Sequence, residues 1–317
     1  MESNAGTARQ LSRKVVLAFV ALALMFGPAT TLASPAFESA MHWQVLTGVA
    51  LSSSLAGSLL LVASFLRRER LPNLRQCEAV ILLLAPRLLV LALASHGPRP
   101  WLHETGWGVA FLLSLAAPLW LGLLSALRIV SIEVPRTLVA ASIAAIGAVL
   151  LWIPTGAYAL KENQVPMLLV HFFVNVAGVF TWWFARQRLG GAAVLPTAGL
   201  FLLLSAGVSG VSAVVSERGA WQPVDWRDAA LPILFQVLLA AGSYWLWFYL
   251  LVRMPLTGFS LHPLAIWIAS TLVGLFFVFF MTLRLDLAVA IAVGAVVVAL
   301  RAQVADEQPT ALGLGGA

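Results

Sequence analysis

Charge is scarce in this sequence. Only 10% of its 317 residues are charged, against ~25% in a typical soluble domain, whereas 61% are hydrophobic. So few polar side chains cannot cover the outside of a water-soluble fold of this length. The composition therefore excludes a soluble protein and predicts an integral membrane protein.

Cysteine and lysine are nearly absent as well. The single cysteine, Cys77, excludes an intramolecular disulfide and a zinc or iron–sulfur site built from the cysteines of one chain. Lys14 and Lys161 are the only lysines, and neither belongs to a glycine-rich phosphate loop, which excludes ATP-driven transport within this chain. The lack of a lysine in the late apolar runs excludes a retinal Schiff base.

Carboxylates are missing from the apolar runs, apart from Glu78 near the end of one. All four aspartates lie in expected loops, links or the tail, at Asp225, Asp228, Asp286 and Asp306. No paired carboxylates and no His–carboxylate cluster within a run offer a metal site. We therefore expect no metal, no cofactor and no enzymatic activity.

The sequence does contain ten long apolar runs. A helix needs roughly 17–25 mostly apolar residues to cross the hydrocarbon core of a bilayer. The runs cover residues 15–33, 43–66, 77–96, 106–127, 137–155, 165–185, 192–215, 229–252, 258–281 and 285–301. This pattern predicts an all-α integral membrane protein with ten transmembrane helices.

Basic residues predict how these helices are oriented. With the N-terminus in the cytoplasm, 13 of the 19 basic residues fall in the inside segments and Arg87 falls within the third run. The outside loops carry the remaining five, which are Arg99, Lys161, Arg218, Arg227 and Arg284. We therefore expect a multi-pass protein of the cell inner (plasma) membrane, with both termini cytoplasmic and a lipid bilayer around it. Spread along one membrane face, the positive charge forms no patch for nucleic acid.

The N-terminus allows an alternative interpretation. A basic segment followed by a short apolar run and the small residues 31–34 is also typical of a cleaved secretory signal. Cleavage would leave nine spans and would unpair the two halves described next. We therefore expect residues 15–33 to remain as the first helix.

An internal repeat divides the chain into two halves. Pro118 begins a long apolar helix that a short link joins to Gly147, and Pro263 leads in the same way to Gly294, with separations of 29 and 31 residues. Because each half has five helices, an odd number, the second half enters the membrane with the opposite orientation. Inverted repeats of this kind are typical of secondary transporters, although common membrane residues could also coincide by chance.

Two stretches resemble a known family. Residues 244–302 resemble the second repeat of the EamA-type drug/metabolite transporter superfamily, with an aromatic-rich helix end, a basic turn, a proline-containing helix and a glycine-containing final helix. Residues 113–152 resemble the first repeat, and Glu133 falls where the family has a glutamate after its fourth helix. The chain departs from the family at Leu283, where the matching glutamate is missing, and in a longer connection between the third and fourth helices.

The resemblance implies a ten-helix carrier of small organic metabolites. We expect the first five-helix repeat at residues 15–155, the second at 165–301, and cytoplasmic tails at 1–14 and 302–317. These ranges define the first half and the second half below.

Polar residues within the runs are the candidate substrate-binding residues. Arg87 lies in the middle of the third run, where a charge is costly unless it faces a cavity or a partner. It could bind a carboxylate or phosphate of the substrate, or it could be a structural arginine satisfied by carbonyls near Pro86 or by snorkelling.

Three later helices carry polar and aromatic stripes. His171 and Asn175 lie one turn apart, with Trp182 near the same face. The eighth run places Gln236, Ser243, Tyr244 and Trp247 on one side, and the ninth carries Trp267 in a stripe with Pro263, which frees a backbone carbonyl. Interhelical hydrogen bonds and packing are the alternative explanations, and stripes of this kind more often reflect packing than a ligand site. His262 lies off the ninth-run stripe and is the weaker candidate.

These observations predict a secondary transporter that works by alternating access. We expect it to export small metabolites, either amino-acid-like or small aromatic compounds, with His171 as the candidate proton carrier because imidazole titrates near neutral pH. The alternatives are an importer or facilitator of a small organic solute, and a non-transporting membrane scaffold or accessory subunit. Small-residue spacing in the fifth and tenth runs fits close helix packing and is compatible with a homodimer.

Overall fold

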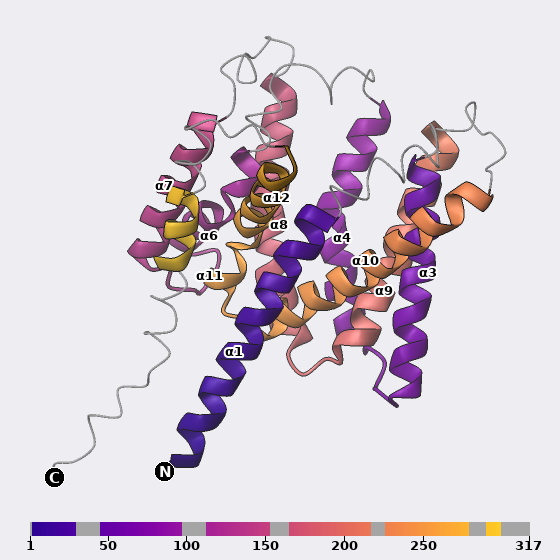
Figure 1. Cartoon of the computed structure of the whole chain (residues 1–317), viewed down its shortest axis with the longest axis horizontal. Helices are drawn as coiled ribbons and strands as arrows, with labels where there is room; N and C mark the ends of the chain where they lie inside the picture. The colour runs from indigo at the N-terminus through magenta and orange to yellow at the C-terminus, as the bar shows by residue number, and fades with distance from the viewer. Residues whose placement is uncertain are drawn as a thin grey trace.

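Helices are the only regular secondary structure in the described part of the chain. The structure is a computed structural model that describes residues 2–29, 45–96, 112–152, 165–216, 226–278 and 290–298 (Figure 1). The labelled helices are α1 (Glu2–Leu24), η1 (Met25–Ala29), α3 (Val45–Leu66), α4 (Leu74–His96), α6 (Ala117–Ala126), α7 (Arg136–Trp152), α8 (Val165–Leu189), α9 (Val194–Ser216), α10 (Trp226–Arg253), α11 (Leu256–Phe259) and α12 (His262–Val278). No strand occurs within these ranges, which confirms the predicted all-α class.

Four helices are long and apolar enough to cross a membrane. These spans are Leu46–Leu66, Leu168–Leu189, Val194–Val215 and Trp226–Arg253. Shorter apolar helices cover Ala117–Ala126, Arg136–Leu150 and Leu256–Leu272. Membrane-spanning character is thus supported, while the full set of ten spans stays a prediction.

Local hydrogen bonds explain where α4 begins. The backbone N–H of Gln76 donates to Oδ1 of Asn73 at 3.0 Å, and the backbone N–H of Asn73 donates to Oε1 of Gln76 at 2.9 Å. This reciprocal capping box satisfies two donors that the first helical turn leaves unpaired. It starts the helix at Leu74, three residues before the apolar run.

The most extensive described contact between helices joins α3 to α9. A Cβ atom added to Gly57 would lie 2.8 Å from the carbonyl oxygen of Gly199, and one added to Gly199 would lie 3.0 Å from that of Gly57. Leu203 flanks the first glycine and Leu61 flanks the second in the same way. Only glycine allows this approach, and the contact is reciprocal.

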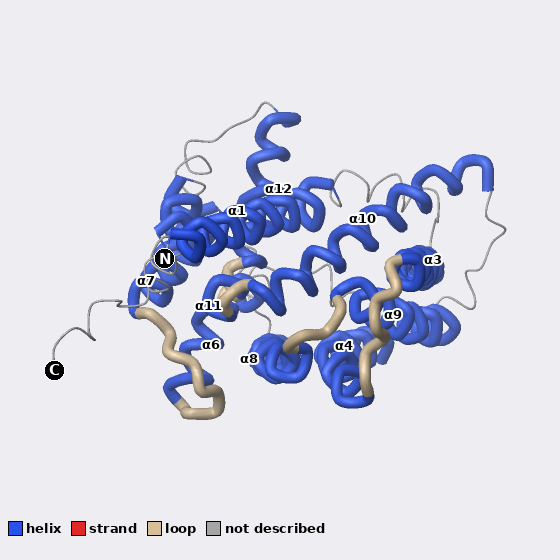
Figure 2. Tube along the Cα trace, turned by 90° about the horizontal axis from the view of Figure 1, so that it is seen from below, coloured by secondary structure: helices blue, strands red, loops and turns tan. Residues whose placement is uncertain are grey.

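The two helices run in opposite directions. Gly210, further along α9 than Gly199, faces Ala50, which precedes Gly57 on α3. In Figure 2 the two helices lie side by side at one edge of the molecule. An antiparallel crossing with reciprocal contacts has local two-fold symmetry.

Four of the other helix contacts form two matching pairs around this crossing. α3 packs against α10, and α9 packs against α4. α1 packs against α12, and α6 packs against α8. By their order in each half, α1 and α3 correspond to α8 and α9. In the same way α4 and α6 correspond to α10 and α12. With these matches, the contact of α3 with α10 corresponds to that of α9 with α4, and the contact of α1 with α12 corresponds to that of α8 with α6.

Two helices are broken in the same way. Residues 112–115 form one helical turn that a turn at Ala116 separates from α6, and Pro118 is the second residue of α6. α11 is likewise a single turn of four residues, and Ser260 and Leu261 separate it from α12, where Pro263 is again second. The run predicted at 258–281 is therefore divided. The prolines that suggested the repeat mark equivalent breaks.

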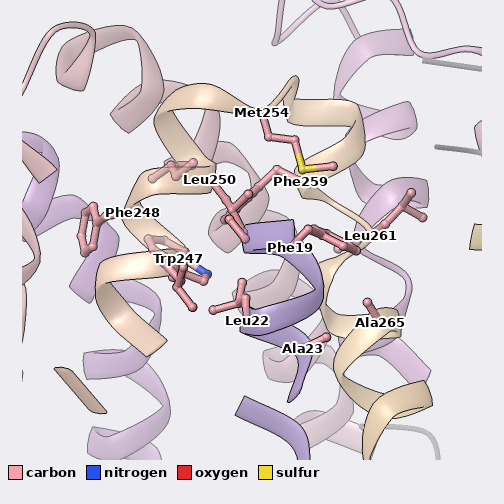
Figure 3. Packing of buried hydrophobic residues seen from close by; sticks show 14 of the residues in the cluster. Phe19, Leu22, Ala23, Trp247, Phe248, Leu250, Met254, Phe259, Leu261 and Ala265 are labelled. Atoms are coloured by element: carbon pink, nitrogen blue, oxygen red, sulfur yellow. The ribbon is translucent and has the colours of Figure 1, made fainter. Parts of the chain in front are cut away.

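α1 ends in the π-helical segment η1, which lies between two helices of the second half. A Cβ atom on Gly27 would lie 2.6 Å from Oγ of Ser270 in α12, so the backbones approach closely there. Gly242 of α10 leaves room for the side chain of Met25. Figure 3 shows Leu22 of α1 pointing toward Trp247 of α10, so the end of the first helix packs against helices of the second half.

Candidate functional site

Four aromatic residues from four helices form one buried group, which we call the aromatic cluster. It consists of Trp182 of α8, Trp247 of α10, Phe259 of α11 and His262 of α12. The Phe259 ring lies 5.4 Å from that of Trp182, 5.3 Å from that of Trp247 and 4.6 Å from that of His262, measured between centroids. Phe259 is fully buried.

The break between α11 and α12 holds His262 in the cluster. Nδ1 of His262 lies 2.8 Å from the carbonyl oxygen of Phe259. Pro263 stands four residues after Phe259 and has no N–H, so the helix itself supplies no donor to that carbonyl. The carbonyl that the proline was predicted to free is therefore taken by a histidine.

The other ring nitrogen of His262 binds a tryptophan. Nε1 of Trp247 donates a hydrogen bond of 3.3 Å to Nε2 of His262. Because an indole N–H is only a donor, Nε2 accepts and the proton resides on Nδ1, which donates to Phe259. Both nitrogens of this buried ring are thus used, and the hydrogen bond joins α10 to α12.

A second set of rings continues the cluster towards the first half. Phe201 of α9 lies 6.3 Å from Trp247 and 5.2 Å from Tyr244, between ring centroids. Tyr244 in turn meets Phe26 of η1 edge-on at 5.3 Å. The first half and the second half therefore meet through aromatic rings at this level.

Two buried hydroxyl groups near the rings have no hydrogen-bond partner among the described residues. They belong to Ser243, which is 1% exposed, and to Ser205, which is 0% exposed. The hydroxyls of Thr181, Ser142 and Thr197 instead donate to carbonyls of their own helices. An unpaired buried hydroxyl costs free energy, so these two serines, like Ser64 near the end of α3, are exceptions that require a reason.

Charged side chains gather at one end of the bundle. Nη1 of Arg188, at the end of α8, lies 3.3 Å from Oε2 of Glu78, at the start of α4. Arg186 of α8 donates to the carbonyl of Met254, just after α10. We call this the Arg188 end. It corresponds to the face predicted to be cytoplasmic.

The predicted site residues do not all converge. Trp182 and Trp247 meet in the aromatic cluster, with Ser243 and Tyr244 next to it on α10. Trp267 is buried on α12, five residues after His262. Gln236 is half-buried and eleven residues before Trp247, about 16 Å along the helix axis.

His171 and Asn175 lie in a separate place on α8. Nδ2 of Asn175 donates to the carbonyl of His171 at 2.7 Å, so this amide bonds to its own helix. Both side chains are half-buried. The next residue, Phe172, meets Trp120 of α6 at 5.1 Å. The side chain of Arg87 lies outside the described residues, and all three residues stay predictions.

Sequence reasoning underrated His262 and missed Phe259, Phe201 and Ser205. His262 was judged by its position on a continuous helical stripe, but the helix breaks just before it. The signal was the sequence His262-Pro263, in which a hydrogen-bonding ring precedes the proline that frees a carbonyl. Nothing in the sequence marks Ser205, because only the packing of neighbouring helices shows that its hydroxyl is buried without a hydrogen-bond partner.

Comparison with known proteins bears on the fold alone. No protein-family model and no curated protein matches the sequence. The chain is similar to a solved structure described only as "Crystal structure of protein", with a TM-score of 0.69 and 19% identity. That similarity covers 95% of this chain and 99% of the other. At this identity, the comparison supports a shared fold over nearly the whole length.

Proposed function

We propose that this protein is a secondary transporter of small organic solutes, built from ten transmembrane helices in two inverted halves. The observation that carries the proposal is the matched packing around the antiparallel crossing of α3 and α9. In inverted-repeat transporters the substrate binds between the halves, and access alternates as one half rocks against the other.

Three independent features support the two-fold relation. The contacts of Gly57 and Gly199 are reciprocal. The contact of α3 with α10 corresponds to that of α9 with α4, and the contact of α1 with α12 corresponds to that of α8 with α6. The fourth helix of each half begins with one isolated turn before a proline. In the predicted topology these breaks lie near opposite membrane faces, as inversion of the second half requires.

The interrupted helices also support a transporter. Irregular backbone at membrane depth is tolerated where protein or a cavity satisfies its polar groups. Here the break before α12 exposes a carbonyl that His262 binds, and the aromatic cluster surrounds it. A helix serving only as an anchor in lipid would gain nothing from such a break.

The character of the proposed binding region suggests the solute. Trp182, Tyr244 and Trp247 offer ring faces, and Ser243 offers an uncharged hydrogen-bonding group. No charged side chain belongs to this group, and the ion pair of Glu78 and Arg188 lies at the Arg188 end. We therefore propose small aromatic or amphipathic metabolites as substrates and export as the direction.

A comparative profile of small molecules tests this function. Cells that make the intact protein are compared with cells that make a Trp182→Ala/Trp247→Ala variant at matched membrane abundance, and compounds are measured inside and outside. Export predicts a compound that accumulates outside only with the intact protein, and import predicts one that is depleted there. Identical profiles in both compartments would favour a non-transporting scaffold.

A further inference from the structure

The unpartnered hydroxyls of Ser205 and Ser243 lie at the same level of two neighbouring helices. The Phe201 ring meets those of Tyr244 and Phe248, so Phe201 of α9 is level with the residues between them on α10. α9 and α10 are consecutive and run in opposite directions (Figure 1). Four residues beyond Phe201, Ser205 is therefore level with Ser243.

Both hydroxyls lie on the side of the cluster that is away from the Arg188 end. Trp247 is four residues after Ser243, or about 6 Å nearer to that end. The hydrogen bond from Trp247 to His262 spans α10 and α12 at this point. Figure 3 shows Leu22 of α1 pointing toward Trp247, so an element of the first half borders the same place.

Neither serine donates its hydroxyl to a carbonyl of its own helix, although a serine in a helix can do so. A helical serine can donate to a carbonyl of the preceding turn, as Ser142 does to Leu138 at 2.7 Å. Ser205 and Ser243 make no such bond. Two free hydroxyls behind a hydrogen-bonded ring pair are suited to bind a solute that enters when the pair opens.

We propose that Ser205 and Ser243 form a binding subsite for an uncharged hydrogen-bonding group of the solute, and that the hydrogen bond between Trp247 and His262 is the latch that closes it from the Arg188 end. This inference rests on the proposed function and adds Ser205 and His262 to the proposed site. The solute class is a neutral ring or chain bearing a hydroxyl, amide or similar group.

Thiol labelling tests the latch without any transport measurement. In a Cys77→Ser background, Ser243→Cys or Ser205→Cys is exposed to a small charged methanethiosulfonate reagent in membrane vesicles of each orientation. Labelling is expected to be slow from the Arg188 end. Adding Trp247→Phe, which removes the donor, or His262→Phe, which removes the acceptor, should raise its rate about fivefold to tenfold, the effect of one lost hydrogen bond.

Trp245→Phe is the matched control. Trp245 is 37% exposed and lies two residues before Trp247. Trp245→Phe therefore makes the same chemical change as Trp247→Phe but leaves the hydrogen bond to His262 in place. The latch is overturned if labelling is fast in the parent, if neither latch variant accelerates it, or if Trp245→Phe accelerates it equally.

Removing each hydroxyl tests the subsite. Because an unpartnered hydroxyl contributes nothing to the fold, Ser205→Ala and Ser243→Ala should keep or raise the thermal unfolding midpoint in detergent. Ser142→Ala, which loses a bonded hydroxyl, should lower the midpoint. A decrease in the two serine variants like that of Ser142→Ala would overturn the subsite. Neither the labelling test nor the stability test requires a transport measurement. The subsite and latch can therefore be contradicted while the proposed transport function stands, and the reverse.

Discussion

At the scale of single residues, Phe259 is the centre of the aromatic cluster. It is 0% exposed and contacts three other rings across three helices. Phe259→Ala should lower the free energy of unfolding by about 3–5 kcal/mol, because it removes a buried ring and leaves a cavity. Thermal unfolding in detergent measures this. Phe65→Ala, at an 82% exposed position, is the control and should change the midpoint little.

The ion pair between Glu78 and Arg188 should contribute far less. Both side chains are substantially exposed, at 63% and 39%, so water and salt screen their attraction. Glu78→Gln should change the free energy of unfolding by less than about 1 kcal/mol. Denaturant titration in micelles checks this, and a loss several times larger would show that the pair is essential for joining α4 to α8.

Residue identities could be predicted from the sequence only where a helix stays regular. Trp182 and Trp247 were predicted from stripes on continuous helices, and both lie in the aromatic cluster. His171 and Asn175 were predicted by the same reasoning, yet the Asn175 amide bonds within its own helix. A stripe shows which residues share a face, but it does not show which other helix covers that face.

At the scale of elements, the crossing of α3 and α9 depends on two glycines. A methyl group at Gly199 would lie 3.0 Å from the carbonyl oxygen of Gly57, and neither backbone can move without separating the helices. Gly199→Ala should therefore cost about 1–3 kcal/mol of stability. Thermal unfolding again supplies the measurement.

Gly207→Ala on the same helix is the matched control. An added Cβ there meets nothing within 4 Å, and alanine favours a helix over glycine by about 0.5–1 kcal/mol. This variant should keep or raise the unfolding midpoint. Equal losses in the two variants would contradict the account of the crossing, because they would point to glycine flexibility rather than close packing.

The apolar runs predicted where the helices lie, but they did not predict where the helices are interrupted. The long runs correspond to α3, α4, α8, α9 and α10 within a few residues. The breaks at Ala116 and at Ser260 and Leu261 were not predicted, because no single residue there forbids a helix. The prolines that follow are tolerated at the start of a helix, so on their own they mark a beginning rather than a break.

At the scale of the whole molecule, the proposed ten-span topology with inverted halves predicts which membrane face each loop occupies. In the Cys77→Ser background, cysteines placed at Arg70 and Gly190 should react with an impermeant thiol reagent from one membrane face. Cysteines placed at Lys161 and Trp221 should react only from the other. Labelling of intact cells and of inverted vesicles measures this, and reaction of all four from one face would contradict the ten-span topology.

The sequence indicated the repeat but not how the halves pack. Pro118 and Pro263 suggested two equivalent segments, and the structure gives them equivalent breaks. The reciprocal contact of Gly57 and Gly199 was not predicted, because both residues are ordinary small residues of apolar helices. Contacts across a two-fold axis join distant segments, and hydrophobic periodicity contains no information on such pairs.

Counterflow in proteoliposomes tests the central claim most directly. The purified protein is reconstituted, the compound named by the profile is loaded inside unlabelled, and uptake of the labelled compound from outside is followed. A carrier with alternating access should take up label severalfold faster into loaded vesicles than into empty ones, and Trp182→Ala/Trp247→Ala should abolish the difference. Equal uptake into loaded and empty vesicles, with intact protein in both, would contradict alternating access.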